Sequence, residues 1–91
     1  MAAKRLLIVG RVQGVGFRAW MVREAERLGV SGWVRNRRDG ALEALVDGDT
    51  ASVEELLRLC RRGPRHAEVT EIVEELAEPW PEPGFARLPW A

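Results

Sequence analysis

The sequence is poor in the residues that build disulfides and metal centres. In 91 residues it has one cysteine, Cys60, and one histidine, His66. A lone cysteine cannot form a disulfide within the chain, which is typical of proteins in a reducing compartment. One cysteine and one histidine also fall short of the Cys and His ligand sets that hold zinc. We therefore expect Cys60 to be a small core residue and His66 to lie in a solvated loop or at a strand edge.

A long hydrophobic run and a net charge are also missing. The apolar run at residues 6–9 is too short for the core of a secretory signal, and it is far too short to span a bilayer. Lysine and arginine total 14, as do aspartate and glutamate, so the formal net charge is zero. This balance disfavours a protein that coats nucleic acid or an anionic membrane. We expect a cytoplasmic monomer that binds neither membrane nor nucleic acid.

The residues that are present suit one small globular domain. Apolar residues make up 46% of the chain and charged residues 31%, the balance of a folded protein. A chain of this length can bury one modest core between two layers. We therefore expect residues 1–91 to form a single domain.

Hydrophobic periodicity predicts the elements of this domain. Helices are expected where apolar residues recur at helical spacing, and strands where short apolar runs lie between turn residues. The predicted strands cover residues 6–12, 31–38, 41–46 and 67–76, with a short closing strand at 85–88, and the predicted helices cover residues 17–28 and 51–62. Asp39 and Gly40 suit a hairpin turn, and Asp49 or Thr50 can cap the second helix. This order predicts an α+β, ferredoxin-like βαββαβ sandwich with one antiparallel sheet and two helices on one face.

The strongest local signal, GRVQGVGFR at residues 10–18, lies between a predicted strand and a predicted helix. Glycines there let backbone N–H groups turn inward and form an anion-binding concavity. The helix N-terminus adds free N–H groups and a positive dipole end. Arg18 falls in the first helical turn, where its guanidinium can meet phosphate oxygens bidentately. The spacing is neither that of a Walker loop nor that of a Rossmann fingerprint. Taken alone, the segment fits a glycine-rich turn with a surface arginine as well as a phosphate cradle.

A second motif, GWVRNRRDG, occupies residues 32–40. Together the two segments resemble the signatures of the acylphosphatase family, G-x-V-Q-G-V-x-F-R and G-W-V-x-N-x-x-D-G, and the chain matches every fixed position of both. The resemblance covers roughly residues 6–73, with a weaker echo at Phe85 and Arg87.

The resemblance implies an enzyme that hydrolyses the carboxyl–phosphate bond of small acyl phosphates to carboxylate and inorganic phosphate. It implies that Arg18 and Asn36 are the catalytic residues and that no metal or organic cofactor is used. In the family, the loop amides and the arginine bind the phosphate, while the asparagine holds the attacking water. The implied phosphate-binding residues are Gln13, Gly14, Val15, Gly16, Phe17 and Arg18.

Elementary chemistry agrees with these roles. An acyl phosphate has a good leaving group, so the barrier lies mainly in bringing water onto a dianionic phosphoryl group. Oriented donors that stabilise charge on the equatorial oxygens, and a polar group that aligns the water, are the useful contributions. The amide of Asn36 can both donate and accept, but it is a poor base. The water's proton would therefore pass to the substrate phosphate.

Other interpretations stay open at this stage. The main one is a nucleic-acid-binding ferredoxin-like module without catalytic activity, because RNA-recognition domains share the same element order. Such domains carry aromatics on their central strands, whereas residues 6–12 have none and we expect Trp33 in the core. Residues 79–83 could instead dock to a proline-recognising partner, although a surface loop is favoured. Domains of this kind also begin larger carbamoyl-transfer maturation proteins. Strand alternation places Arg35 opposite Asn36, and we assign Arg35 no role.

Overall fold

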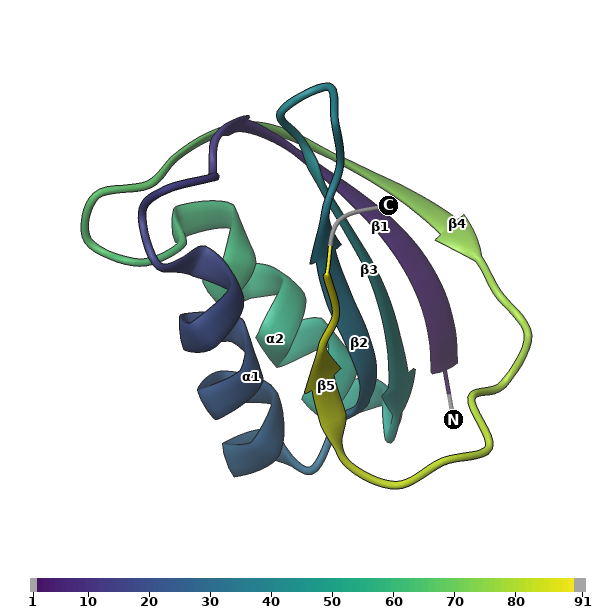
Figure 1. The fold of residues 1–91 in the computed structure, drawn as a ribbon. Coiled ribbons are helices and arrows are strands. Elements are labelled where there is room, and N and C mark those ends of the chain that lie inside the picture. Colours follow the sequence, from purple (N-terminus) through teal and green to yellow (C-terminus); the bar gives the residue numbers. More distant parts are fainter. Residues whose placement is uncertain (1, 90–91) are drawn as a thin grey trace.

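The computed structural model describes residues 2–89, which form a five-stranded sheet with both helices packed on one face (Figure 1). The elements in chain order are β1 (Ala2–Arg11), α1 (Phe17–Leu28), β2 (Ser31–Asn36), β3 (Leu42–Gly48), α2 (Thr50–Arg62), β4 (Glu68–Leu76) and β5 (Phe85–Arg87). The strand order is β4-β1-β3-β2-β5. The predicted ferredoxin-like βαββαβ sandwich is confirmed, and β1 to β4 pair antiparallel.

The sheet is mixed and not wholly antiparallel as the sequence predicted, because β5 pairs with β2 in parallel. Since β4 and β5 lie at opposite edges, residues 77–84 cross the end of the whole sheet (Figure 1). Partway along this crossing, the backbone N–H of Trp80 donates to a carboxylate oxygen of Asp47 at 2.7 Å. The pairing extends one residue past β5, where the N–H of Leu88 donates to the carbonyl of Val34 at 2.9 Å. Pro89 follows directly and has no N–H to continue the ladder.

The core lies between the helices and one face of the sheet. Helix α1 buries Phe17, Met21 and Ala25, which recur at helical spacing. Gly29 ends this helix in the left-handed conformation. Helix α2 is capped by Asp49, whose carboxylate accepts from the N–H of Ser52 at 3.0 Å. Neither helix within residues 2–89 is long and apolar enough to cross a membrane.

The second face of the sheet carries no helix. The residues of β2 that lie on this outer face show that one prediction from the sequence is wrong. On β2, Gly32, Val34 and Asn36 are buried, whereas Trp33 and Arg35 alternate with them on the outer face. The prediction that Trp33 belongs to the core is therefore wrong: strand alternation gives the inward position to Val34. The Trp33 ring instead lies under the Arg35 guanidinium, 5.0 Å from ring centroid to guanidinium carbon. The expectation that Arg35 faces away from Asn36 is confirmed.

Candidate active site

A small pocket opens where the loop between β1 and α1 meets the ends of β2 and β5. Its volume is about 120 Å³. The lining residues are Val12, Gln13, Gly14, Gly16, Phe17, Arg18, Ala19, Asn36 and Arg87. The fold thus brings the two sequence motifs to one place. Val15 is the single predicted phosphate-binding residue absent from this lining, and its side chain packs against the hydrophobic core.

The loop that lines this pocket has unused backbone donors. Gly14 and Gly16 have φ values of +73° and +78°, the left-handed region in which glycine alone carries no steric penalty. Within residues 2–89, no N–H of residues 13–16 donates to a backbone carbonyl. Gly16 is the N-cap of α1, and no side chain caps this helix end. Because the first N–H groups of a helix have no partner within the helix, loop and helix end together form a site suited to an anion.

Arg18 is positioned by the end of β5. From the first turn of α1, its Nη1 donates to the carbonyl of Leu88 at 3.1 Å. Leu88 is itself held through its bond to Val34 on β2. No ion pair among the described residues involves Arg18. A guanidinium has five N–H donors, so one bond to Leu88 fixes the side chain and leaves donors for phosphate oxygens.

Asn36 is almost wholly buried, yet its side-chain amide has no protein partner. The residue is 6% exposed at the end of β2. Its amide makes no hydrogen bond to any residue in the described part of the chain. In the same part of the chain, every side-chain nitrogen or oxygen that is sealed from solvent has a hydrogen-bond partner. The amide therefore reaches solvent through the pocket that it lines. Such an amide can hold a water or a substrate oxygen.

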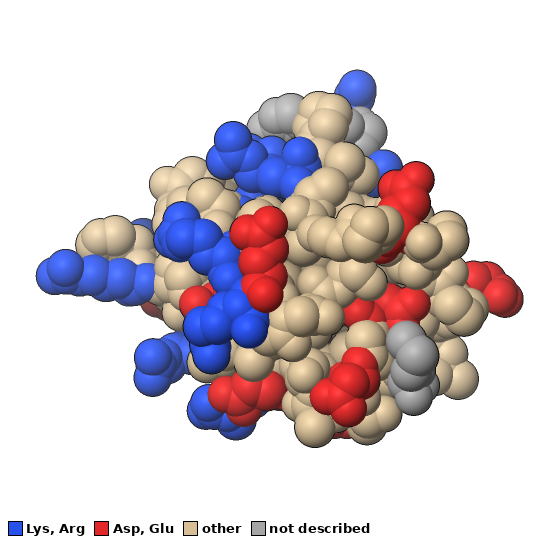
Figure 2. All heavy atoms as spheres, turned by 90° about the horizontal axis from the view of Figure 1, so that it is seen from below, with Lys and Arg blue, Asp and Glu red and all other residues tan. Residues whose placement is uncertain are grey.

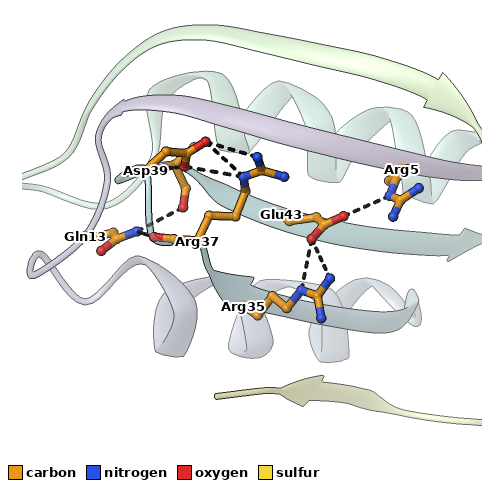
Figure 3. A network of polar contacts seen from close by, with 7 residues as sticks. Arg5, Gln13, Arg35, Arg37, Asp39 and Glu43 are labelled. Atoms are coloured by element: carbon orange, nitrogen blue, oxygen red, sulfur yellow. Dashed lines mark hydrogen bonds and ion pairs between the residues drawn. The ribbon is translucent and has the colours of Figure 1, made fainter. Parts of the chain in front are cut away.

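A second group of arginines lies on the outer face of the sheet, but these arginines are paired with carboxylates. The Glu43 side chain is 7% exposed and accepts from Arg5 Nε at 2.9 Å and Arg35 Nη2 at 2.8 Å (Figure 3). Burial alone would raise the pKa of Glu43, but the hydrogen bonds and charges of the two guanidinium groups outweigh burial and lower it. Arg37 is likewise paired with Asp39, at 3.1 Å. The hollow of about 480 Å³ lined by these groups is thus a less suitable anion site than the smaller pocket.

The remaining chemically notable residues take no part in the site. Cys60 is fully buried in α2, and burial raises the pKa of its thiol to about 12, so the core role expected for it is confirmed. His66 is exposed in the loop between α2 and β4, also as expected. In the part of the chain that the structure describes, no three His, Cys, Asp or Glu side chains gather as a metal site.

Sequence reasoning missed two contributions from the C-terminal strand. Arg87 lines the pocket, and the Leu88 carbonyl fixes Arg18. The signals for Arg87 were a basic residue in the closing strand and the weaker family echo at Phe85 and Arg87. Nothing in the sequence indicated the parallel register of this strand against β2. That register pairs Arg87 with inward-facing Val34 and so turns Arg87 toward the site.

Comparison with known proteins places the sequence in one family. The sequence model of the acylphosphatase family matches residues 4–86. An acylphosphatase from Acidiphilium cryptum is 67% identical over 87 residues, covering 96% of each chain. One from Moorella thermoacetica is 49% identical over 79 residues, covering 87% of this chain and 85% of the other.

Solved structures agree with these relatives. The acylphosphatase from Bacillus subtilis has a TM-score of 0.91 and 31% identity, and the match covers 97% of this chain and 99% of that one. A full-length HypF in its phosphate- and nucleotide-bound form has a TM-score of 0.89 and 27% identity, but this chain covers only 12% of it. Relatives of nearly equal length thus match both the sequence and the fold, and the chain belongs to the acylphosphatase family of enzymes.

Proposed function

We propose that this chain hydrolyses small acyl phosphates at the pocket between the two motifs. The N–H groups of residues 13–18 and the guanidinium of Arg18 bind the phosphate, and the amide of Asn36 holds the attacking water. The products are a carboxylate and inorganic phosphate, and the reaction needs no cofactor. Family membership supports the reaction class, and the geometry of the pocket supports the residue roles.

One observation carries this proposal. A buried amide without a protein partner, at Asn36, lines the same pocket of about 120 Å³ as Arg18 and the unpaired N–H groups of the loop. Because this amide reaches solvent through the pocket and makes no hydrogen bond to a described residue, its donors and its acceptor are free for a water or a substrate oxygen. A phosphoryl group bound to the loop would place its phosphorus within reach of a water held by Asn36.

The chemistry follows from charge and alignment. Fixed N–H donors and a guanidinium stabilise negative charge on the equatorial oxygens as the carboxylate leaves. The asparagine amide aligns the water in line with the leaving group without taking its proton. The proton passes to a phosphate oxygen, so the atoms balance without an additional base.

A nucleic-acid-binding role has less support. RNA-recognition domains stack bases on aromatic side chains of their central strands. Of the three interior strands, β1 and β3 have no aromatic residue. Trp33 does lie on the outer face, but on β2, where it packs with Arg35.

Hydrolysis of benzoyl phosphate by the wild type, Arg18→Ala and Asn36→Ala tests the residue roles. We expect Arg18→Ala to lose about 10²–10³-fold in kcat, as when one donor to a developing charge is removed, and to bind inorganic phosphate weakly. We expect Asn36→Ala to lose about 10²-fold in kcat while inorganic phosphate still inhibits it as it inhibits the wild type. Wild-type rates in Arg18→Ala would refute the assigned site, and full turnover in Asn36→Ala would refute the role of the amide.

A further inference from the structure

The side chain of Gln13 is bound to the hairpin between β2 and β3. Gln13 is half-buried in the loop between β1 and α1. Its Nε2 donates to the carbonyl of Arg37 at 2.8 Å and to the carbonyl of Ala41 at 2.9 Å (Figure 3). A side-chain amide has only two N–H donors, so both are used by these bonds.

The two carbonyls that Gln13 contacts lie at the base of the hairpin. The N–H of Arg37 donates to the carbonyl of Ala41 at 2.9 Å, and the N–H of Gly40 donates to the carbonyl of Arg37 at 3.2 Å. Asp39 fixes the turn from within, accepting from the N–H of Ala41 at 3.0 Å and pairing with Arg37. The hairpin base is therefore rigid, and Gln13 supplies the second donor to each of its two carbonyls.

This contact joins the two halves of the candidate site. Arg37 directly follows Asn36, and Ala41 directly precedes Leu42, the residue that pairs with Asn36 across the sheet. Gln13 begins the segment that presents the unused N–H groups. The bridge therefore fixes the distance between the phosphate loop and the amide of Asn36.

We propose that the Gln13 side chain is a positioning residue, which sets the attacking water at the right distance from the bound phosphorus by holding the loop against the hairpin. This inference rests on the proposed function. Gln13 acts through Asn36 and does not bind substrate with its side chain, because both of its N–H groups are committed to Arg37 and Ala41. Its backbone N–H remains part of the phosphate loop.

Kinetics of Gln13→Met test this role. Methionine has a similar length and no donor, so the backbone of the loop is kept while the bridge is lost. We expect kcat for benzoyl phosphate to fall about 10–100-fold, the range expected when reacting groups are misplaced by up to about 1 Å. We expect the inhibition constant of inorganic phosphate to change less than about threefold, because the phosphate ligands are untouched. In an Asn36→Ala background, the same substitution should cost less than about threefold in kcat, because residues that act as one unit are not additive.

Two results would overturn the positioning role. One is a Gln13→Met enzyme that keeps kcat while phosphate inhibition weakens, which would make the side chain a ligand. The other is an equal loss of kcat with and without Asn36, which would make the two residues independent. Gln13→Ala, which places no group against the two carbonyls, gives a second measurement of the same contact if Gln13→Met does not fold.

A matched control separates positioning from simple loss of stability. At the far end of β2, the Ser31 hydroxyl donates to the carbonyl of Asp47 at 3.3 Å. Ser31→Ala removes a side-chain-to-backbone hydrogen bond between β2 and β3, the two strands that the hairpin joins. This variant should leave kcat unchanged. A wild type without hydrolysis, or one unaffected by Arg18→Ala, would refute the proposed function. Hydrolysis that needs Arg18 and Asn36 but not the Gln13 amide would refute only the positioning role.

Discussion

At the scale of single residues, one buried carboxylate of the sheet, that of Glu43, lies outside the site. Glu43 lies on the outer face, where Arg5 and Arg35 both donate to its carboxylate. These bonds lower the pKa of Glu43 below its ordinary value of 4.5 in spite of burial. Because the folded-state pKa is lowered, ionised Glu43 stabilises the fold above about pH 4.5, and this contribution disappears as the pH falls through the lowered pKa.

The variant Glu43→Gln should therefore be less stable than the wild type at pH 7 and closer to it at pH 3. We expect a loss of about 1–2 kcal/mol at pH 7. Hydrogen bonds to charged groups contribute about 1.5–3 kcal/mol, but the Arg5 side chain is 53% exposed and solvent weakens its share. Urea unfolding at the two pH values measures the difference. Glu82→Gln, in the exposed loop before β5, is the control. An equal deficit at both pH values would contradict the assigned ion pairs.

At the scale of elements, β5 connects the edge of the sheet to the site. Phe85 is buried against the core, and Leu88, just beyond the strand, holds Arg18. A strand of three residues has little else to keep it in place, so loss of the Phe85 ring should loosen the carbonyl that Arg18 contacts.

Phe85→Ala should accordingly weaken both the fold and phosphate binding. Replacing a buried phenylalanine by alanine costs about 3–5 kcal/mol, which lowers the melting temperature. Loss of one hydrogen bond to Arg18, worth about 1.5 kcal/mol, should raise the inhibition constant of inorganic phosphate about tenfold below the melting transition. Leu76→Ala, exposed at the end of β4 on the opposite edge, should change neither quantity. Phosphate inhibition unchanged in Phe85→Ala would show that β5 does not position Arg18.

Elements with local signals were predictable from the sequence, and those fixed by distant partners were not. The predicted helix at residues 17–28 has the bounds of α1, because its apolar spacing and Gly29 are both local. Strand β1 begins four residues before its predicted start, because Lys4 and Arg5 hide the strand pattern. Their partners, Glu74 and Glu43, come from β4 and β3.

The same distinction applies to the candidate site. Glycine chemistry and a first-turn arginine indicated residues 13–18 as a candidate phosphate loop, and the resemblance to a family added Asn36 as a candidate catalytic residue. The roles of Arg87 and of the Leu88 carbonyl depend on β5 crossing to the far edge of the sheet and pairing parallel to β2. A three-residue strand after a proline-rich crossing has no local pattern that fixes either feature.

At the scale of the whole molecule, the formal net charge is zero, but the charged side chains are unevenly distributed over the surface. Figure 2 shows the end of the molecule that faces downward in Figure 1, away from the loop between β1 and α1. Acidic side chains spread over its middle and right, and basic ones gather on its left. In the pocket, by contrast, Arg18 and Arg87 take part in no ion pair with any other described residue.

The uncompensated charge at the pocket should draw anionic substrates to it, so association should depend on salt. The Debye length falls from about 30 Å at 0.01 M salt to about 3 Å at 1 M. We therefore expect kcat/KM for benzoyl phosphate to fall several-fold across this range, while kcat changes little because screening acts on the long-range attraction that precedes binding.

Arg87→Ala separates long-range attraction from direct binding. Arg87 is exposed at the mouth of the site, so its loss should lower kcat/KM at low salt and reduce the slope of log kcat/KM against log salt. At 1 M salt, where the charge of Arg87 is screened, the variant and the wild type should converge. Arg38→Ala, another exposed arginine without an ion pair in residues 2–89 but outside the pocket lining, is the control and should keep most of the slope. A deficit in Arg87→Ala that persists at 1 M salt would instead mean that Arg87 contacts the bound substrate, because only a direct contact survives screening.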